Sequence, residues 1–288
     1  MADGRAAVAR AARRVAALVG RRRRPLLVVV LLVATVAALA GDGEPPAERP
    51  TDLAALLEVE PSLAPRPSRS ALAPTRSNGL ACVADGPVER RRGRADRRRR
   101  VALTFDDGPS PFTIRILHEL ERRKARATFF QLGREVARRP WVSRELVRRG
   151  HALGNHSWSH PSLAAGDGRA RRQLAFAHGA LRGAVGHAGC LVRPPYGAVG
   201  PRYERLLRHR GELSILWDVD PQDWKRPGVQ AIVRDVVARA RPGSIVLLHD
   251  GGGDRTQTLR ALPWIIKGLR RRGLHLVTVP TLLGLERR

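Results

Sequence analysis

Cysteine and aromatic residues are scarce in this chain, and each scarcity limits the classes of protein to which it can belong. The 288 residues include two cysteines, Cys82 and Cys190, and neither has another Cys or a His at zinc-finger spacing. Aromatic residues make up 4%, but Leu, Val, Ile and Ala are plentiful from Val101 onward. We therefore expect one folded domain with a core of ordinary size after residue 100, and no disorder of the chain as a whole.

Acidic residues are also few, because 26 Asp and Glu face 53 Lys and Arg, a net charge of +27. Such an excess can indicate a nucleic-acid partner. The basic residues are spread along the chain, however, with no Arg-rich helix carrying interleaved aromatics and no helix-turn-helix pattern. We therefore expect no specific nucleic-acid partner. We interpret the charge as a solvated surface, with attraction to anionic lipids or wall polymers as the alternative.

Residues 25–40 contain no charged side chain and follow Arg21–Arg24, which is typical of a membrane-targeting segment. As a helix this segment would span ~24 Å, a little less than the ~30 Å of a bilayer core. It is either a signal anchor or a signal peptide cleaved after Ala40, and the long basic leader favours the anchor. Arginines before the segment and acids after it predict that the remainder of the chain lies outside the membrane.

Residues 41–100 are rich in Pro, Ala, Ser and Arg, and we interpret them as a flexible linker. In an exported protein Cys82 and Cys190 could form one disulfide, and two separate buried thiols are the alternative. The predicted organisation is a basic leader over residues 1–24, the apolar segment 25–40, the linker 41–100 and one folded domain over 101–288.

Short apolar runs alternate with amphipathic helical stretches beyond residue 100. This alternation predicts parallel strands joined by crossover helices. Functional side chains gather at the carboxyl ends of the strands in such folds, and the polar motifs of this chain follow its apolar runs. Strands are predicted at residues 101–105, 127–133, 151–156, 190–193, 213–219, 244–248 and 274–279, and helices at 113–123 and 142–149.

Two polar motifs carry residues suited to metal chemistry. Asp106 and Asp107 end the first predicted strand, and the turn at Gly108-Pro109 lets both point into one cleft, one to bind a cation and one to handle a proton. His156 and His160 are four residues apart, so a single helical turn would present both on one side. Three such N and O ligands suit a catalytic zinc site, with cobalt, nickel, manganese or iron left open. Each motif alone also fits a solvated turn or surface histidines.

Two further motifs carry residues suited to proton transfer and charge stabilisation. In Arg193-Pro194-Pro195-Tyr196-Gly197 the prolines lack N–H groups, so the next free amide is that of Tyr196, which could stabilise an oxyanion, while Arg193 could pair with a carboxylate. His249 ends another predicted strand and could be tuned as a general acid by a neighbouring carboxylate. The candidate carboxylates are Asp218, Asp220 and Asp223.

Taken in order, the segments TFDDGP, HSWSH, RPPYG, DPQDW and LLHD resemble the five motifs of NodB-type polysaccharide deacetylases, carbohydrate esterase family four. The resemblance covers about residues 101–283 and is specific as a set, particularly to bacterial peptidoglycan N-acetylglucosamine deacetylases. It implies a distorted (β/α)7-type barrel. It also implies that the metal ligands are Asp107, His156 and His160.

The same resemblance implies a role for each remaining site residue. Asp106 would be the base that takes a proton from water, with Arg193 paired to it. His249, oriented by Asp223, would protonate the departing amine. The Tyr196 amide would hold the oxyanion, and Trp224 and Leu247 would line the pocket for the acetyl methyl group.

The function expected from these features is metal-dependent removal of N-acetyl groups from an extracytoplasmic polysaccharide, most of all the N-acetylglucosamine of peptidoglycan. The partners would be the wall polysaccharide and, through the apolar segment, the membrane, with the chain a monomer. The alternatives are a chitooligosaccharide deacetylase, an O-acetylxylan esterase, or a wall-binding protein without catalysis.

Overall fold

The structure, a computed structural model, describes residues 89–90 and 96–285. The predicted leader, the apolar segment 25–40, most of the linker and Cys82 lie outside the described residues, so what the sequence predicts for them stays a prediction. Within the described ranges no helix has both the length and the apolar character needed to cross a membrane. The described residues belong to one compact unit, 61–288.

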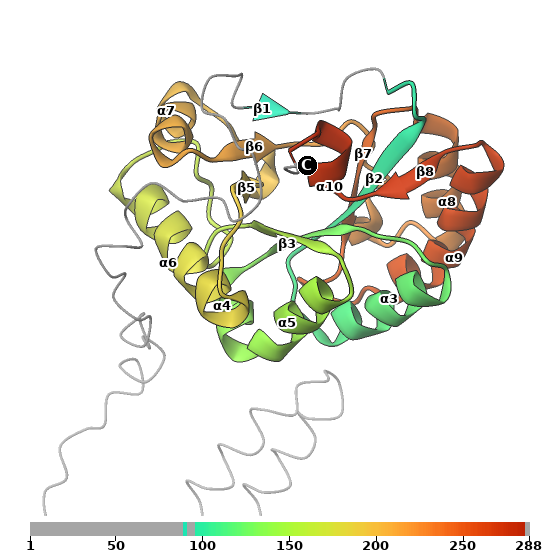
Figure 1. The fold of residues 1–288 in the computed structure, drawn as a ribbon, viewed down its shortest axis with the longest axis horizontal. Coiled ribbons are helices and arrows are strands. Elements are labelled where there is room, and N and C mark those ends of the chain that lie inside the picture. The colour runs from blue at the N-terminus through green and yellow to red at the C-terminus, as the bar shows by residue number, and fades with distance from the viewer. Residues whose placement is uncertain (1–88, 91–95, 286–288) are drawn as a thin grey trace, which may run out of the picture. The chain divides into compact units, whose positions relative to one another are not determined.

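An eight-stranded, wholly parallel sheet forms the centre of this unit (Figure 1). The strand order is β1-β6-β5-β4-β3-β2-β7, and β8 pairs with the beginning of β2. The bounds are β1 Glu89–Arg90, β2 Arg100–Asp106, β3 Thr128–Gln131, β4 Ala152–Asn155, β5 Leu191–Val192, β6 Leu213–Ile215, β7 Ile245–His249 and β8 His275–Val277. Each predicted strand is confirmed at its expected place.

The sheet curls, and the segment after β6 reaches across to β7. Val219 forms a single parallel bridge with Val246. Asp218 supports this crossing, because its Oδ1 accepts a hydrogen bond from the Ile245 N–H at 2.7 Å and its Oδ2 accepts one from the Ser244 hydroxyl at 2.8 Å. Asp218 is thus a structural residue. The expectation of a barrel is confirmed in its coarser part, a curled half-barrel of parallel strands, in which a single bridge and no strand pair joins the segment after β6 to β7.

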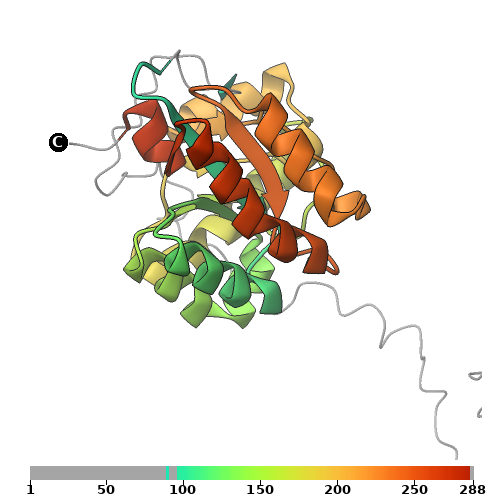
Figure 2. The same cartoon turned by 90° about the vertical axis from the view of Figure 1, so that its right-hand side faces the viewer.

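Most of the helices cover the outside of the curled sheet, whereas the last one, α10, packs against its inward-facing residues (Figures 1 and 2). Helix α3 shows why they form where they do: Ser110 caps its first turn with Thr113, and Pro111 occupies its first position. The helices are α3 Pro111–Arg122, α4 Gly133–Arg138, α5 Pro140–Arg148, α6 Gly168–Val185, α7 Pro201–Arg210, α8 Val229–Arg239, α9 Thr256–Arg271 and α10 Val279–Leu283. The predicted helices at 113–123 and 142–149 are confirmed as α3 and α5.

The sheet is buried on both faces, as expected for parallel strands. Its outer face packs with α3, α5, α6, α8 and α9 into the larger core cluster, in which the rings of Phe105 and Phe129 stack 5.1 Å apart. A second cluster joins inward-facing strand residues to Val279 and Leu282 of α10. Cys190 lies in this second cluster, fully buried, and is disulfide-bonded.

Candidate functional site

Asp106 and Asp107 lie at the carboxyl end of β2, and both line one cavity of about 460 Å³. Asp107 adopts the left-handed backbone conformation with φ of 74°, a conformation that Asp tolerates better than most residues. The loop after β7 presses against this turn so closely that a Cβ on Gly251 would lie 2.1 Å from the Asp107 carbonyl oxygen. The expectation that the turn directs both acids into one cleft is confirmed.

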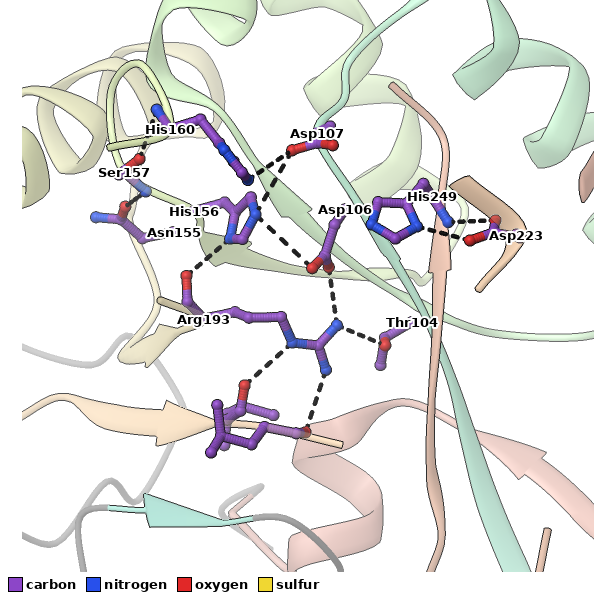
Figure 3. Close-up of polar contacts among 12 residues, drawn as sticks. Thr104, Asp106, Asp107, Asn155, His156, Ser157, His160, Arg193, Asp223 and His249 are labelled. Atoms are coloured by element: carbon purple, nitrogen blue, oxygen red, sulfur yellow. Dashed lines mark hydrogen bonds and ion pairs between the residues drawn. The ribbon is translucent and has the colours of Figure 1, made fainter. Parts of the chain in front are cut away.

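His156 and His160 follow β4 in a loop, and the expected helical turn is wrong. Ser157 and His160 both have a φ of 71°, which no α-helix contains. The Asn155 Oδ1 accepts a hydrogen bond from the Ser157 N–H at 2.8 Å, and the Ser157 hydroxyl accepts one from the His160 N–H at 2.9 Å. These local bonds compete with helical ones and hold both rings toward the cavity (Figure 3).

Three ligand atoms of Asp107, His156 and His160 lie within 4.8 Å of one another. The Asp107 Oδ1 is 3.6 Å from the His156 Nε2 and 3.4 Å from the His160 Nε2, too far for hydrogen bonds. This buried oxygen has no hydrogen-bond partner. Tetrahedral ligands at ~2.0–2.1 Å from a zinc ion lie about 3.3 Å apart. The three side chains therefore fit a divalent metal held between them.

The protonation of both rings suits metal binding. The His156 Nδ1 lies 2.7 Å from the Arg193 carbonyl oxygen, which can only accept, so Nδ1 carries the proton and Nε2 presents a lone pair to the site. Burial and the neighbouring His156 lower the pKa of His160, which keeps that ring neutral. The tautomer of His156 and the neutral ring of His160 thus both suit a metal ligand.

Arg193 is fully buried and fixes Asp106 from behind the cavity. Its guanidinium donates to the Asp106 Oδ1 at 2.8 Å and to the Thr104 hydroxyl at 2.7 Å. Two further bonds go to backbone carbonyls of Ile215 and Leu216. The other Asp106 oxygen faces His156, 3.7 Å from its Nε2, so one carboxylate oxygen is held and the other is presented to the cavity.

His249 and Asp223 form the second proton-handling pair of the site. The Asp223 Oδ1 lies 2.7 Å from the His249 Nδ1, while its Oδ2 accepts from the His249 N–H and from the Thr258 hydroxyl. Burial lowers the pKa of His249, but the hydrogen bond and charge of Asp223, with the charges of Asp106 and Asp107, outweigh it and raise the pKa above its usual value. The ring is therefore prepared to hold a proton.

The remaining predicted residues surround the cavity mouth. Tyr196 has a φ of 62°, and none of the described residues accepts a hydrogen bond from its N–H. Its side chain is 71% exposed, and Trp224 is 49% exposed, while Leu247 is buried on the wall. Eight predicted residues line the cavity: Asp106, Asp107, His156, His160, Tyr196, Trp224, Leu247 and His249. Arg193 and Asp223 support it from behind.

Sequence reasoning missed several residues that shape the site. Trp217 and Arg255 line the cavity, as does Asp220, which the sequence offered only as a candidate partner of His249, a place that Asp223 takes. Asp250 is fully buried behind the Asp107 turn, where its Oδ2 accepts from the Thr113 hydroxyl at 2.5 Å. Burial and the charges of Asp107 and Asp106 raise the pKa of Asp250 to about 7. The sequence feature that could have indicated Asp250 is its position directly after His249.

A family model described as polysaccharide deacetylase matches residues 93–211. A peptidoglycan-N-acetylglucosamine deacetylase from Bacillus cereus is 38% identical over 187 residues, which cover 64% of this chain and 87% of that protein. The chain belongs to the polysaccharide deacetylase family. The resemblance inferred from the five motifs is therefore confirmed, and in this polysaccharide deacetylase each of the five motifs contributes side chains to one cavity.

Other similar proteins differ in what they are named to act on. A chitooligosaccharide deacetylase from Bradyrhizobium sp. is 39% identical over 209 residues, 68% of this chain and 95% of that protein. A crystal structure of a peptidoglycan N-acetylglucosamine deacetylase, in complex with 4-naphthalen-1-yl-N-oxidanyl-benzamide, superposes with a TM-score of 0.66 at 33% identity. That alignment covers 69% of this chain and 95% of the other.

Proposed function

We propose that this polysaccharide deacetylase is a metal-dependent hydrolase that removes N-acetyl groups from N-acetylglucosamine in peptidoglycan. The single observation that carries the metal dependence is the Asp107 Oδ1, a buried carboxylate oxygen without a hydrogen-bond partner that faces the Nε2 atoms of His156 and His160. Buried polar atoms are nearly always satisfied, and a shared cation satisfies all three groups at once. The donor set favours zinc, and cobalt, nickel, manganese or iron would also fit it.

When bound, such a cation supplies Lewis-acid polarisation of the acetyl carbonyl and lowers the pKa of a water. Groups of the protein itself carry out the other steps. Asp106 takes the proton of the attacking water, because Arg193 holds one of its oxygens and leaves the other free. The water oxygen bonds to the acetyl carbon, which leaves the negative charge on the carbonyl oxygen, and the Tyr196 N–H donates to that oxyanion. His249 gives its proton to the amine as the C–N bond breaks, which yields acetate and a free amino sugar.

The cavity supports a polysaccharide substrate bound at the surface with one acetyl group inserted. Leu247 provides an apolar wall for the methyl group, and Trp224 and Tyr196 stand exposed beside the opening. Sugar rings pack well on such exposed aromatic faces. Identity does not separate the two substrate classes of the relatives, since the peptidoglycan and chitooligosaccharide deacetylases are 38% and 39% identical.

The location favours peptidoglycan. We propose that the apolar segment 25–40 exports the chain and anchors it, so that the domain works outside the membrane where peptidoglycan lies. Cleavage near Ala40 would instead release it into the same compartment. A chitooligosaccharide deacetylase is the second candidate, and the identity to the Bradyrhizobium protein is the observation that favours it.

Acetate release tests this function. The purified protein would be given peptidoglycan, chitin oligomers and acetylated xylan, with and without a chelator. We expect release from peptidoglycan, its loss on chelation, and its recovery when zinc is added back. Undiminished activity in the chelated protein would refute the metal dependence, and release from chitin oligomers or xylan without any from peptidoglycan would refute the substrate.

A matched pair of variants separates the site from general damage. His156→Ala removes a proposed ligand, whereas His275→Ala removes an exposed histidine on β8. We expect the first variant to be inactive and the second to be as active as the unaltered protein. Equal loss in both would show that the assay reports stability and not the metal site.

A further inference from the structure

An exposed tryptophan surrounded by cations lies on the outer wall of the domain, away from the catalytic cavity. Trp264 of α9 is 57% exposed and separates two hollows, one of about 660 Å³ between α8 and α9 and one of about 560 Å³ beside Arg123 at the end of α3. We call this surface the Trp264 face. The outer sides of α8 and α9 are turned toward the viewer in Figure 2.

The Trp264 face carries positive charge only. No Asp or Glu lines either hollow, and the basic residues that do are Arg123, Arg234, Arg241, Lys267, Arg270, Arg271 and Arg272. Within the described part of the chain, no carboxylate forms an ion pair with Arg234, Lys267 or Arg271. The Lys267 ammonium lies 5.5 Å from the centre of the Trp264 ring. Cations near helix ends interact with the helix dipole, but that does not account for an exposed tryptophan among them.

This face extends along α8 and α9 to the end of the domain at which β2 begins. The guanidinium of Arg99 donates to the carbonyl oxygens of Arg272 and Gly273, directly after α9. Arg100 at the start of β2 pairs with His275. The cavity opens at the other ends of the strands, beyond Asp106 and His249.

Tryptophan with Lys and Arg is the combination that settles at a membrane surface, where the ring lies among headgroups and the cations meet anionic lipid. If the predicted linker before β1, residues 41–88, is a flexible chain, its end-to-end distance is on the order of 40 Å, similar to the diameter of a domain of this size. An anchored domain would therefore meet the membrane at high effective concentration, and a contact of low affinity would be enough to hold the domain on the membrane surface.

We propose that the Trp264 face docks onto the anionic lipid headgroups of the membrane that holds the apolar segment 25–40. Docking through this wall leaves the cavity mouth, which none of its residues lines, uncovered for a glycan strand. The proposal rests on the proposed export and anchoring, and not on the deacetylase chemistry. It explains why three cations of this face, Arg234, Lys267 and Arg271, have no carboxylate partner among the described residues.

The lysines of the chain can report on the contact, because there are only three, Lys124, Lys225 and Lys267, and each can be followed separately. Lys267 belongs to the Trp264 face, whereas Lys225 lies beside Trp224 at the cavity mouth. The full chain would be inserted into vesicles of phosphatidylcholine alone or of equal parts phosphatidylcholine and phosphatidylglycerol. A membrane-impermeant acetylating reagent would then modify exposed lysines, and mass spectrometry would give the rate at each one.

We expect the anionic lipid to slow modification of Lys267 by about fivefold or more, the effect of roughly one cation at a charged surface, and to leave Lys225 unchanged. High salt should remove the protection. Equal rates for Lys267 in both vesicles would overturn the proposal. Stronger protection by soluble poly(glycerol phosphate) than by anionic vesicles would also overturn it, in favour of a wall polymer.

Paired variants identify the face. Trp264→Ala with Arg271→Gln should abolish the protection of Lys267, whereas Arg202→Gln with Arg205→Gln removes two exposed arginines of α7 and should leave it intact. The reverse pattern would overturn the proposal. Both variants should release acetate from soluble peptidoglycan fragments at the unaltered rate, which shows that they are folded. A chain that floats with neither vesicle would refute the anchor and the docking face together, while leaving the deacetylase function standing.

Discussion

Asp223 holds His249 at two points, with one carboxylate oxygen 2.7 Å from the ring Nδ1 and the other 2.9 Å from the backbone nitrogen. The same oxygen that meets the backbone also accepts from Thr258, so Asp223 is itself fixed. Although burial raises the pKa of Asp223, these hydrogen bonds and the His249 charge lower it below its usual value. The pair therefore keeps a negative carboxylate against a ring whose pKa is raised.

Replacement of Asp223 by Asn should change the pH dependence of kcat. His249 must be protonated to act as the acid, so activity is present below its pKa and is lost as the pH rises through it. Asp223→Asn removes the charge that raises this pKa, so the descending limb should move to lower pH. We also expect kcat near pH 7 to fall by about 10- to 100-fold. A profile of kcat against pH checks this, and an unmoved descending limb would contradict it.

Replacement of Arg193 by Leu should cost both stability and activity. The side chain is fully buried and paired with Asp106, and removal of one partner of such a pair typically costs about 3–5 kcal/mol of unfolding free energy. Arg210 offers a matched control, because it is also buried and paired, with Glu212 outside the site. Denaturant unfolding should show a loss in both variants, and acetate release by the folded fraction should fall only in Arg193→Leu. Full specific activity in Arg193→Leu would show that Asp106 does not need its partner.

Replacement of Gly251 by Ala should disturb the metal site from behind. The new Cβ would lie 2.1 Å from the Asp107 carbonyl oxygen, so the Asp107 turn must move. Gly183 is the control, because it is exposed in α6 and a Cβ added there would have no atom within 4 Å. We expect Gly251→Ala to lower zinc affinity and acetate release by about tenfold or more. Gly183→Ala should keep both and gain about 0.5–1 kcal/mol of stability. Unchanged zinc affinity in Gly251→Ala would contradict the rigid placement of Asp107.

The strands could be predicted from the sequence because their burial leaves a direct trace in it. Parallel strands covered on both faces consist of continuous apolar runs, and the sequences of β2, β3 and β7 each contain such a run. The polar residues that end these runs meet at one edge of the sheet, so Asp106 and His249 could be placed together. Asp106 and His249 are indeed register partners in the pairing of β2 with β7.

The loop that carries His156 and His160 could not be predicted, because its shape depends on contacts remote in sequence. Gln173 of α6 accepts hydrogen bonds from the Trp158 and Ser159 N–H groups, both at 2.9 Å. Spacing alone suggested a helical turn. The same holds for Asp218, whose partners Ser244 and Ile245 lie on another strand, so its structural role was invisible beside the neighbouring acids.

Metal binding by Asp107, His156 and His160 is the central claim, and titration of the metal-free protein with zinc in a calorimeter tests it most directly. We expect one ion per chain in the unaltered protein and in Asp106→Asn, which should bind zinc but lose about 100- to 10,000-fold in kcat. His156→Ala and His160→Ala should not bind at this site. Unchanged stoichiometric binding in His156→Ala, or its loss in Asp106→Asn alone, would contradict the account.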